Sequence, residues 1–292
     1  MNTAVQILVS GLTLGAMYAI STIGLSLAWG AVGVLNMAQG GFLVIGGYAA
    51  YAGATYLGLS APLALALSAL AGAAVGAATY FFVIRFMLDC DNFETNVIIA
   101  TVGLALIFEN VILQAFGAYP LRQPVRIEGG VNIAATYVPY ESIAILAASV
   151  TAMMAVAWVL ARTRMGRSIR AVSQNRAAAL LMGVPVNTVY LQVLTISGVL
   201  AALSGVMLST ITTLAPTMGY DPMLKAFIVC VVAGLGNMYG ALYAAFALGI
   251  LEASVQFFLG VRFGFPAMLL LIILTLVWRP YGVFGRGVTQ RF

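Results

Sequence analysis

Residues 5–29 read VQILVSGLTLGAMYAISTIGLSLAW, a stretch that holds no charged side chain. A helix needs about 20 apolar residues to cross a hydrocarbon core about 30 Å thick. This stretch therefore predicts a membrane-spanning helix. The charge-free region extends well beyond it, because the first Asp, Glu, Lys or Arg of the chain is Arg85.

The composition of the whole chain indicates the same class of protein. Of 292 residues, 63% are hydrophobic and 7% are charged, whereas soluble domains carry about 25% charged residues. So few charges exclude a soluble enzyme, a nucleic-acid-binding domain and a disordered scaffold. The apolar runs are continuous and do not alternate with polar residues, which favours helices over a transmembrane β-barrel. We attribute the net charge of +5 to topology signals beside the spans.

The apolar runs predict an all-α polytopic membrane protein with eight to nine transmembrane helices, some of them broken or re-entrant. We treat residues 1–292 as one transmembrane domain. The seventh run is short, which is typical of half of a broken pair. The expected spans are 5–29, 36–57, 62–84, 95–116, 141–161, 187–213, 223–236, 239–260 and 264–279.

Arginines in short loops set the expected orientation, because Lys and Arg are enriched in cytoplasmic loops. Five arginines fall within residues 162–176 with no acid among them, and the last span is followed by Arg279, Arg286 and Arg291. Placing both groups and Arg85 inside leaves outside only Arg122, Arg126, Lys225 and Arg262. The C-terminus is then cytoplasmic and the N-terminus lies outside. The loop over about residues 117–140 is also outside, and its short β-prone pieces predict a small hairpin cap.

Glycines are dense in residues 30–53, where the polar side chains Asn36 and Gln39 lie among them. Dense glycine weakens a helix, and non-helical backbone in a membrane is tolerated where it is buried in protein or lines a cavity. Interrupted spans are where transporters place binding sites. We therefore expect a substrate pathway here, with Asn36 and Gln39 as polar groups and Gly40 and Gly41 as positions of close backbone approach. The alternative is dense helix packing.

Other glycines mark a turn and two helix contacts. Gly234-Leu235-Gly236-Asn237 separates two apolar runs, and the expected orientation makes it a tight inside turn, with a re-entrant loop as the alternative. Gly11 and Gly15 have the small-xxx-small spacing that lets helix backbones approach, as do Gly72 and Gly76. For both pairs we expect dense packing of the bundle.

Two carboxylates, Glu109 and Glu252, fall inside apolar runs. Acids inside a membrane are costly, and each is a functional hypothesis by default. The neighbouring Asn110 and Gln114 indicate that Glu109 takes part in a polar contact between helices. We expect both acids to be structural, either neutral or hydrogen-bonded, with ion coupling as the alternative.

A basic segment at about residues 162–186 lies between the fifth and sixth spans. Within it Asn175 is a good N-cap, residues 177–182 are strong helix formers, and Gly183 suits the position after a helix end. Such a short helix with exposed small and apolar side chains needs a partner surface; the alternative is an interfacial helix resting on lipid headgroups. The residues expected to form this coupling segment are Arg170, Asn175, Ala177, Ala178, Leu181, Met182 and Gly183.

Several motifs, in the same order along the chain, resemble the LivH-type permease subunits of ABC importers for branched-chain amino acids and related solutes. The resemblance covers nearly the whole chain and is carried by residues 13–27, 34–42, 164–183, 225–227, 234–241, 248–253 and 279–286. Residues 34–42 read VLNMAQGGF, which resembles the family's N-F-A-H-G signature. Gln39 stands where the family usually has His, which argues against a His-specific role.

The resemblance implies a subunit of the bacterial inner (plasma) membrane with no catalytic chemistry of its own. The implied partners are a second permease subunit of LivM type, two ATP-binding subunits, an external solute-binding protein, a small-molecule substrate and the lipid bilayer, without nucleic acid. The helix at residues 176–182 then docks into a groove on an ATP-binding subunit. The chain has no G-x-x-x-x-G-K-[ST] loop, and its only lysine is Lys225, so it lacks the usual phosphate cradle.

Three other functions stay open at this stage. Close relatives carry urea or short amides, and the Gly-Leu-Gly-Asn turn also resembles that branch. The second alternative is a stand-alone channel or an ion-coupled carrier. The predicted ATPase-docking helix argues against it, because neither kind of protein needs one. An enzyme is least favoured, because no cluster of His, Cys or paired acids is present. The chain has no His, and Cys90 and Cys230 lie in unlike contexts, so we expect no metal, disulfide or cofactor.

Overall fold

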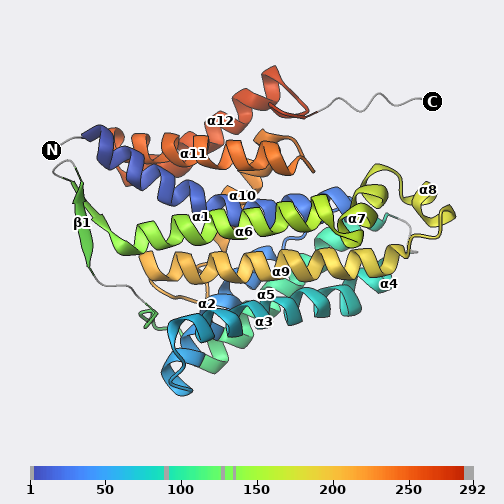
Figure 1. The fold of residues 1–292 in the computed structure, drawn as a ribbon, viewed down its shortest axis with the longest axis horizontal. Helices are drawn as coiled ribbons and strands as arrows, with labels where there is room; N and C mark the ends of the chain where they lie inside the picture. The colour runs from blue at the N-terminus through green and yellow to red at the C-terminus, as the bar shows by residue number, and fades with distance from the viewer. Residues whose placement is uncertain (1–2, 89–91, 126–128, 134–135, 286–292) are drawn as a thin grey trace.

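The computed structural model describes residues 3–88, 92–125, 129–133 and 136–285 and is built mainly of helices (Figure 1). The residues Cys90, Arg126, Arg286 and Arg291, discussed above, lie outside this described part. The helices are α1 (Thr3–Val32), α2 (Gln39–Tyr56), α3 (Ala61–Thr79), α4 (Arg85–Met87), α5 (Phe93–Phe116), α6 (Tyr140–Arg162), α7 (Arg164–Gln174), α8 (Arg176–Leu181), α9 (Val186–Ile211), α10 (Tyr220–Ala233), α11 (Met238–Leu259) and α12 (Gly264–Trp278). A π-helical turn, Tyr80–Ile84, joins α3 to α4, and a 3-10 turn, Val261–Phe263, precedes α12.

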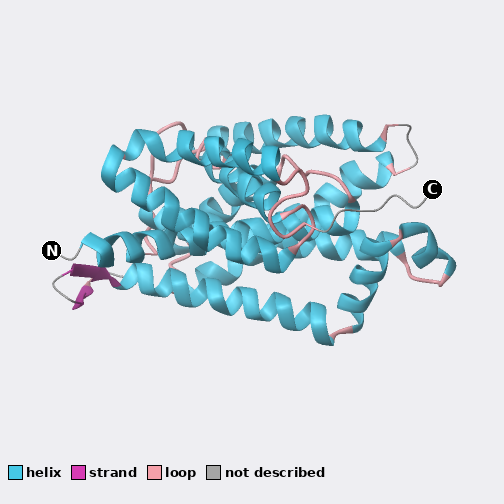
Figure 2. Ribbon diagram, turned by 90° about the horizontal axis from the view of Figure 1, so that it is seen from above, coloured by secondary structure: helices cyan, strands magenta, loops and turns pink. Residues whose placement is uncertain are grey.

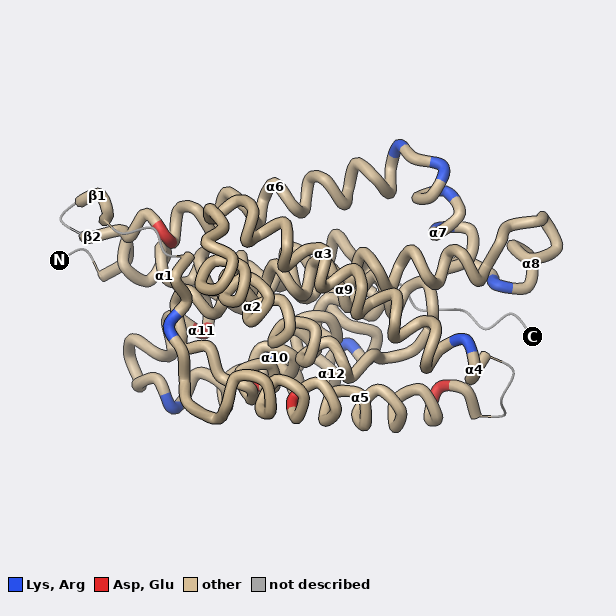
Figure 3. The backbone as a smooth tube through the Cα atoms, turned by 90° about the horizontal axis from the view of Figure 1, so that it is seen from below, with Lys and Arg blue, Asp and Glu red and all other residues tan. Residues whose placement is uncertain are grey.

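The long helices run side by side along the length of the molecule (Figure 1). The N-terminus and strand β1 (Gly130–Ile133) lie at one end, and α4, α7, α8 and the C-terminus lie at the other. Figure 2 shows the strands beside the N-terminus, far from the C-terminus. Figure 3 shows Lys and Arg gathered around α4, α7 and α8. The arginines of α4, α7 and α8, which the sequence predicted to lie on the same side of the membrane, therefore lie at the same end of the bundle.

Seven helical segments are long and apolar enough to cross a membrane. They are Thr3–Val32, Ala61–Met87, Phe93–Phe116, Tyr140–Arg162, Val186–Ile211, Met238–Leu259 and Val261–Trp278. The chain is therefore an all-α polytopic membrane protein. The expected spans 36–57 and 223–236 correspond to α2, which is rich in glycine, and to α10, which has 14 residues. Each follows a non-helical stretch, at residues 33–38 and 212–219.

Helix α1 lies at the centre of the packing. In its most apolar stretch 67% of the residues are buried, against 11% in the span Val261–Trp278, which contains α12. Gly11 and Gly15 allow α11 to approach, since a β-carbon on Gly11 would lie 2.6 Å from Cα of Ile250. Gly72 and Gly76 meet the backbone of α9 in the same way. The expected packing role of both glycine pairs is confirmed.

The expected hairpin is present in the loop before α6. Strands β1 and β2 (Thr136–Pro139) pair antiparallel, with Gly130 opposite Pro139 and Val131 opposite Val138. The same loop is tied to the segment after α9, because Leu121 and Leu214 exchange backbone hydrogen bonds of 2.9 and 3.0 Å. This contact holds the stretch 212–219 beside the loop as it turns back toward α10.

Candidate functional site

Helix α8 projects from the basic end of the bundle and is capped at both ends (Figure 1). The side chain of Asn175 accepts a hydrogen bond of 2.9 Å from the backbone N–H of Ala178, as the N-cap assignment predicted. At the other end Gly183 has a φ of +77°. The N–H groups of Gly183 and Val184 donate to the carbonyls of Leu180 and Ala179, the pairing of a Schellman cap. A helix of six residues is not stable by itself in water. The two caps stabilise α8 because they provide hydrogen-bond partners for backbone groups at its ends.

The outer surface of α8 is apolar and exposed. Leu181 is 87% exposed and Met182 84% exposed, and Ala177 and Ala178 are also exposed. Ala179 is buried and anchors the helix. The exposed apolar side chains of α8 therefore lie together at the tip of this end of the bundle.

Helix α7 connects α8 to α6, and the sequence did not predict it as a helix of its own. Thr163 caps its start by accepting a hydrogen bond of 3.1 Å from the N–H of Gly166. Ile169 and Val172 face the core, and the guanidinium of Arg170 donates to the carbonyl of Leu160 on α6. Arg170 therefore lies apart from the exposed residues of α8, on the rigid link behind them.

The two interrupted segments meet inside the bundle. Asn36 lies in the non-helical stretch just before α2, where its side-chain oxygen accepts a hydrogen bond of 3.0 Å from the N–H of Ala38, the residue that precedes the helix. Gly40 then lies against Gly219, the residue before α10, so closely that a β-carbon on Gly40 would be 2.8 Å from the carbonyl oxygen of Gly219. A β-carbon on Gly41 would be 2.7 Å from the ring of Phe108 on α5. The N-termini of α2 and α10 thus form one junction.

The expected pathway residues divide into two pairs at this junction. Gly40 and Gly41 line a small cavity of about 20 Å³. Gln39 is fully buried and faces α9, where its amide oxygen accepts a hydrogen bond of 3.1 Å from the hydroxyl of Ser197. Asn36 is 4% exposed, and its side chain bonds the backbone N–H of Ala38. Neither Asn36 nor Gln39 lines this cavity or the larger cavity at the basic end of the bundle.

Glu252 on α11 is fully buried and accepts three side-chain hydrogen bonds. They come from Nζ of Lys225 at 2.8 Å, Nε2 of Gln256 at 2.9 Å and the hydroxyl of Tyr18 at 2.6 Å. Lys225 also lies 3.1 Å from the carboxylate of Asp221. The lysine side chain is 12% exposed, which corrects its placement among loop cations. It lies one turn inside α10 because a buried carboxylate on α11 requires a counter-charge.

Glu109 on α5 contacts α10. Its carboxylate accepts a hydrogen bond from the hydroxyl of Tyr220, so the polar contact between helices exists. Asn110 was expected to take part in this contact and does not. Its side-chain amide donates a hydrogen bond of 2.8 Å to the carbonyl of Leu106 in its own helix. Glu109 and Tyr220 both line the small cavity beside Gly40.

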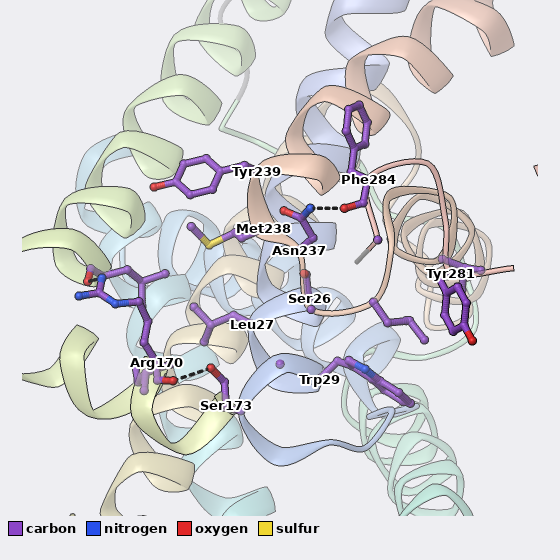
Figure 4. A pocket seen from close by; sticks show the side chains of 18 of the residues that line it. Ser26, Leu27, Trp29, Arg170, Ser173, Asn237, Met238, Tyr239, Tyr281 and Phe284 are labelled. Atoms are coloured by element: carbon purple, nitrogen blue, oxygen red, sulfur yellow. Dashed lines mark hydrogen bonds between the residues drawn. The ribbon is translucent and has the colours of Figure 1, made fainter. Parts of the chain in front are cut away.

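A cavity of about 760 Å³ lies at the basic end, where the sequence predicted none (Figure 4). Its wall combines α1, the end of α6, α7, the turn before α11 and the segment after α12. The turn is the Gly-Leu-Gly-Asn motif, and Asn237 closes it by donating a hydrogen bond of 2.9 Å to the carbonyl of Phe284. Residues 234–237 thus form a turn between two helices.

The described residues contain no group of three or more His, Cys, Asp or Glu side chains placed to hold a metal ion. The charged network around Glu252 joins α1, α10 and α11 by hydrogen bonds within the protein.

Comparison with known proteins identifies the family. Residues 7–278 match the family described as the permease component of branched-chain amino acid transport systems. The chain belongs to this family. The family resemblance carried by the sequence motifs is therefore confirmed, and the protein is a transport permease component.

Three relatives match this permease component over most of their length. The high-affinity branched-chain amino acid permease BraD of Pseudomonas aeruginosa is 26% identical over 98% of this chain and 97% of its own. LivH of Escherichia coli strain K12 is also 26% identical, with the same coverage. A probable LivH of Methanocaldococcus jannaschii is 27% identical over 90% of this chain and 87% of its own. No solved structure matches the permease component.

Sequence reasoning missed the partners of the buried polar groups in this permease component. Tyr18, Ser197 and Tyr220 were not singled out, although each bonds a predicted polar residue. One signal was present in the sequence. A single lysine near the start of one apolar run and a single acid in the next run form the simplest pair that leaves neither charge alone in the membrane.

Proposed function

We propose that this chain is the transmembrane permease subunit of an ATP-driven importer and forms part of the pathway for branched-chain or other hydrophobic amino acids. The family and the names of its relatives support the substrate class. ATP is hydrolysed by separate ATP-binding subunits. The complete importer contains two of these, a second permease subunit of LivM type and an external solute-binding protein.

We further propose that the chain crosses the bacterial inner membrane eight to nine times, and that the number is nine, because only an odd number of crossings places the N-terminus outside and the C-terminus in the cytoplasm. Counting α2 with residues 33–38, and α10 with residues 212–219, adds two interrupted crossings to the seven continuous ones. The basic end of the bundle then faces the cytoplasm, as the enrichment of arginine there favours.

In this assembly α8 is the helix that docks on an ATP-binding subunit. Movement of that subunit reaches the bundle through α7, which packs on α6 and is tied to it by Arg170. The substrate pathway runs past the junction of α2 and α10. Gly40 allows the two backbones to meet there, Gly41 makes room for the ring of Phe108, and Asn36 and Gln39 hold the start of α2 in place.

The observation that carries this function is the capped and exposed apolar tip of α8, and two substitutions test it. Leu181→Asp and Ala178→Asp place a charge on the docking surface while leaving the caps intact. We expect loss of uptake and of transport-coupled ATP hydrolysis, with normal membrane insertion. Thr188→Asp is the matched control, because Thr188 is exposed in the first turn of α9, where an acid is compatible with the helix dipole.

The readouts are amino acid uptake by cells and ATP hydrolysis by the purified importer in lipid discs. Full uptake by the Leu181→Asp variant would refute the docking role of α8. Equal loss in the Thr188→Asp variant would refute it as well, because any added charge at this end would then have the same effect.

A further inference from the structure

Polar side chains are exposed on two neighbouring helices within the membrane-spanning part of the bundle. Glu109 is partly exposed, and it lies seven residues before the end of α5, about 10 Å along a helix that rises 1.5 Å per residue. Asp221 in the first turn of α10 has a side chain that is 66% exposed. We call the surface formed by these two acids with Asn110, Gln114 and Tyr220 the α5–α10 face; all of its members are at least partly exposed.

This surface differs from the exposed face of α12. All exposed residues of α12 are apolar, and the large ones are Leu269, Leu270, Ile273, Leu274, Leu276, Val277 and Trp278. Such a face is suited to lipid. A carboxylate exposed to hydrocarbon is costly, and intramembrane acids almost always face the interior of a bundle or a water-filled cavity. The α5–α10 face therefore requires a covering other than lipid.

We propose that the α5–α10 face is the surface on which the second, non-identical permease subunit packs in the assembled importer, so that Glu109 and Asp221 lie between the two subunits. This inference rests on the proposed function, which supplies the second subunit. The junction of α2 and α10 lies directly beneath the face, because Glu109, Tyr220, Gly40 and Gly219 line the same small cavity. The interrupted segments then adjoin the space between the subunits.

The charges of the face argue against a second copy of this chain as the partner. In a symmetric dimer the same patch meets itself. The charged residues of α5 and α10 are Glu94, Glu109, Asp221 and Lys225, and the lysine is already held by Glu252 and Asp221. Two copies would therefore bring carboxylates against carboxylates, which disfavours the complex. A different subunit that presents hydrogen-bond donors or basic groups fits this face.

The test is site-specific photo-crosslinking in the assembled importer in native membranes. A benzophenone amino acid is placed at Asn110 or Gln114 on the face and, as matched controls, at Leu270 or Ile273 on α12; all four side chains are exposed. The crosslinked products are identified by mass spectrometry. We expect the second permease subunit at Asn110 and Gln114, at a yield well above that at the α12 positions.

Several results would overturn the inference. These are lipid adducts alone at Asn110 and Gln114, a product that joins two copies of this chain, or capture of the second permease subunit as readily from α12. Unmodified chain is purified in parallel, and its co-purifying subunits are identified. If the ATP-binding and second permease subunits co-purify but the face crosslinks to lipid, this inference fails and the proposed function stands. If no second permease subunit co-purifies, both fail.

Discussion

Gly40 and Gly219 bring the backbones of α2 and α10 into direct contact, since a β-carbon on Gly40 would lie 2.8 Å from the carbonyl oxygen of Gly219. Each glycine stands where an interrupted segment becomes a helix. The contact leaves no room for a larger side chain on either residue, so the two helix N-termini meet only because both positions are glycine.

Alanine at this junction should separate the two helices. We expect Gly40→Ala and Gly219→Ala to lower stability by about 1–3 kcal/mol, the usual range for overpacking, and to reduce uptake. The measurement is thermal unfolding of the purified importer in detergent, together with uptake in cells. Gly30→Ala is the control, because a β-carbon there would meet its nearest neighbour at 3.5 Å, an ordinary contact. Unchanged melting of both junction variants would contradict the steric argument.

Substitution of Gln39 separates a pathway role from a packing role. Gln39→Leu leaves the hydroxyl of Ser197 without its side-chain partner, and an unpaired buried polar group costs about 1–3 kcal/mol. We therefore expect a lower melting temperature, and partial recovery when Ser197→Ala is added. If Gln39 contacts the substrate instead, uptake falls while melting is unchanged. Melting and uptake measured on the single and double variants decide between these roles.

The buried ion pair should behave as one unit. Lys225→Met leaves the buried Glu252 carboxylate without its cation, and breaking a buried pair costs about 3–5 kcal/mol. The double variant Lys225→Met with Glu252→Leu removes both charges, so we expect it to melt at a higher temperature than either single variant. A double-mutant cycle on melting measures the coupling. Additive effects of the two substitutions would show that the pair is not a unit.

The caps of α8 should affect how efficiently ATP hydrolysis is coupled to transport. Asn175→Ala removes a side-chain cap that is worth about 1 kcal/mol, and Gly183→Ala strains a residue whose φ is +77°. Both should increase hydrogen exchange of the α8 amides and lower transport per ATP hydrolysed. Gln174→Ala, at an exposed position that ends α7, serves as the control. Unaltered exchange in the capping variants would contradict this account.

The chain by itself should not conduct solute. A permease that depends on ATP-binding subunits should show no leucine flux in liposomes when it is reconstituted alone, and flux should appear only with its partners and ATP. Radiolabelled leucine uptake measures this directly. Liposomes with a known channel protein show that the assay detects passive flux. Substantial unassisted uptake would favour the stand-alone channel.

Several features were predictable because they depend on short stretches of chain. The length of an apolar run decides whether a helix can span a bilayer, which is why the seven continuous spans were recognisable. The caps Asn175 and Gly183 act on neighbouring backbone groups, and the hairpin before α6 pairs residues a few positions apart. None of these requires knowledge of distant contacts.

The partners of the buried polar groups were decided only by the tertiary structure. Gln39 bonds a residue 158 positions away, and Tyr18 bonds Glu252 across 234 positions. In a chain so uniformly apolar, many helix faces are equally hydrophobic, so local pattern does not select which faces meet. Close packing at small residues and the cost of leaving a charge unpaired in the membrane make that selection, and both act only once the helices are side by side.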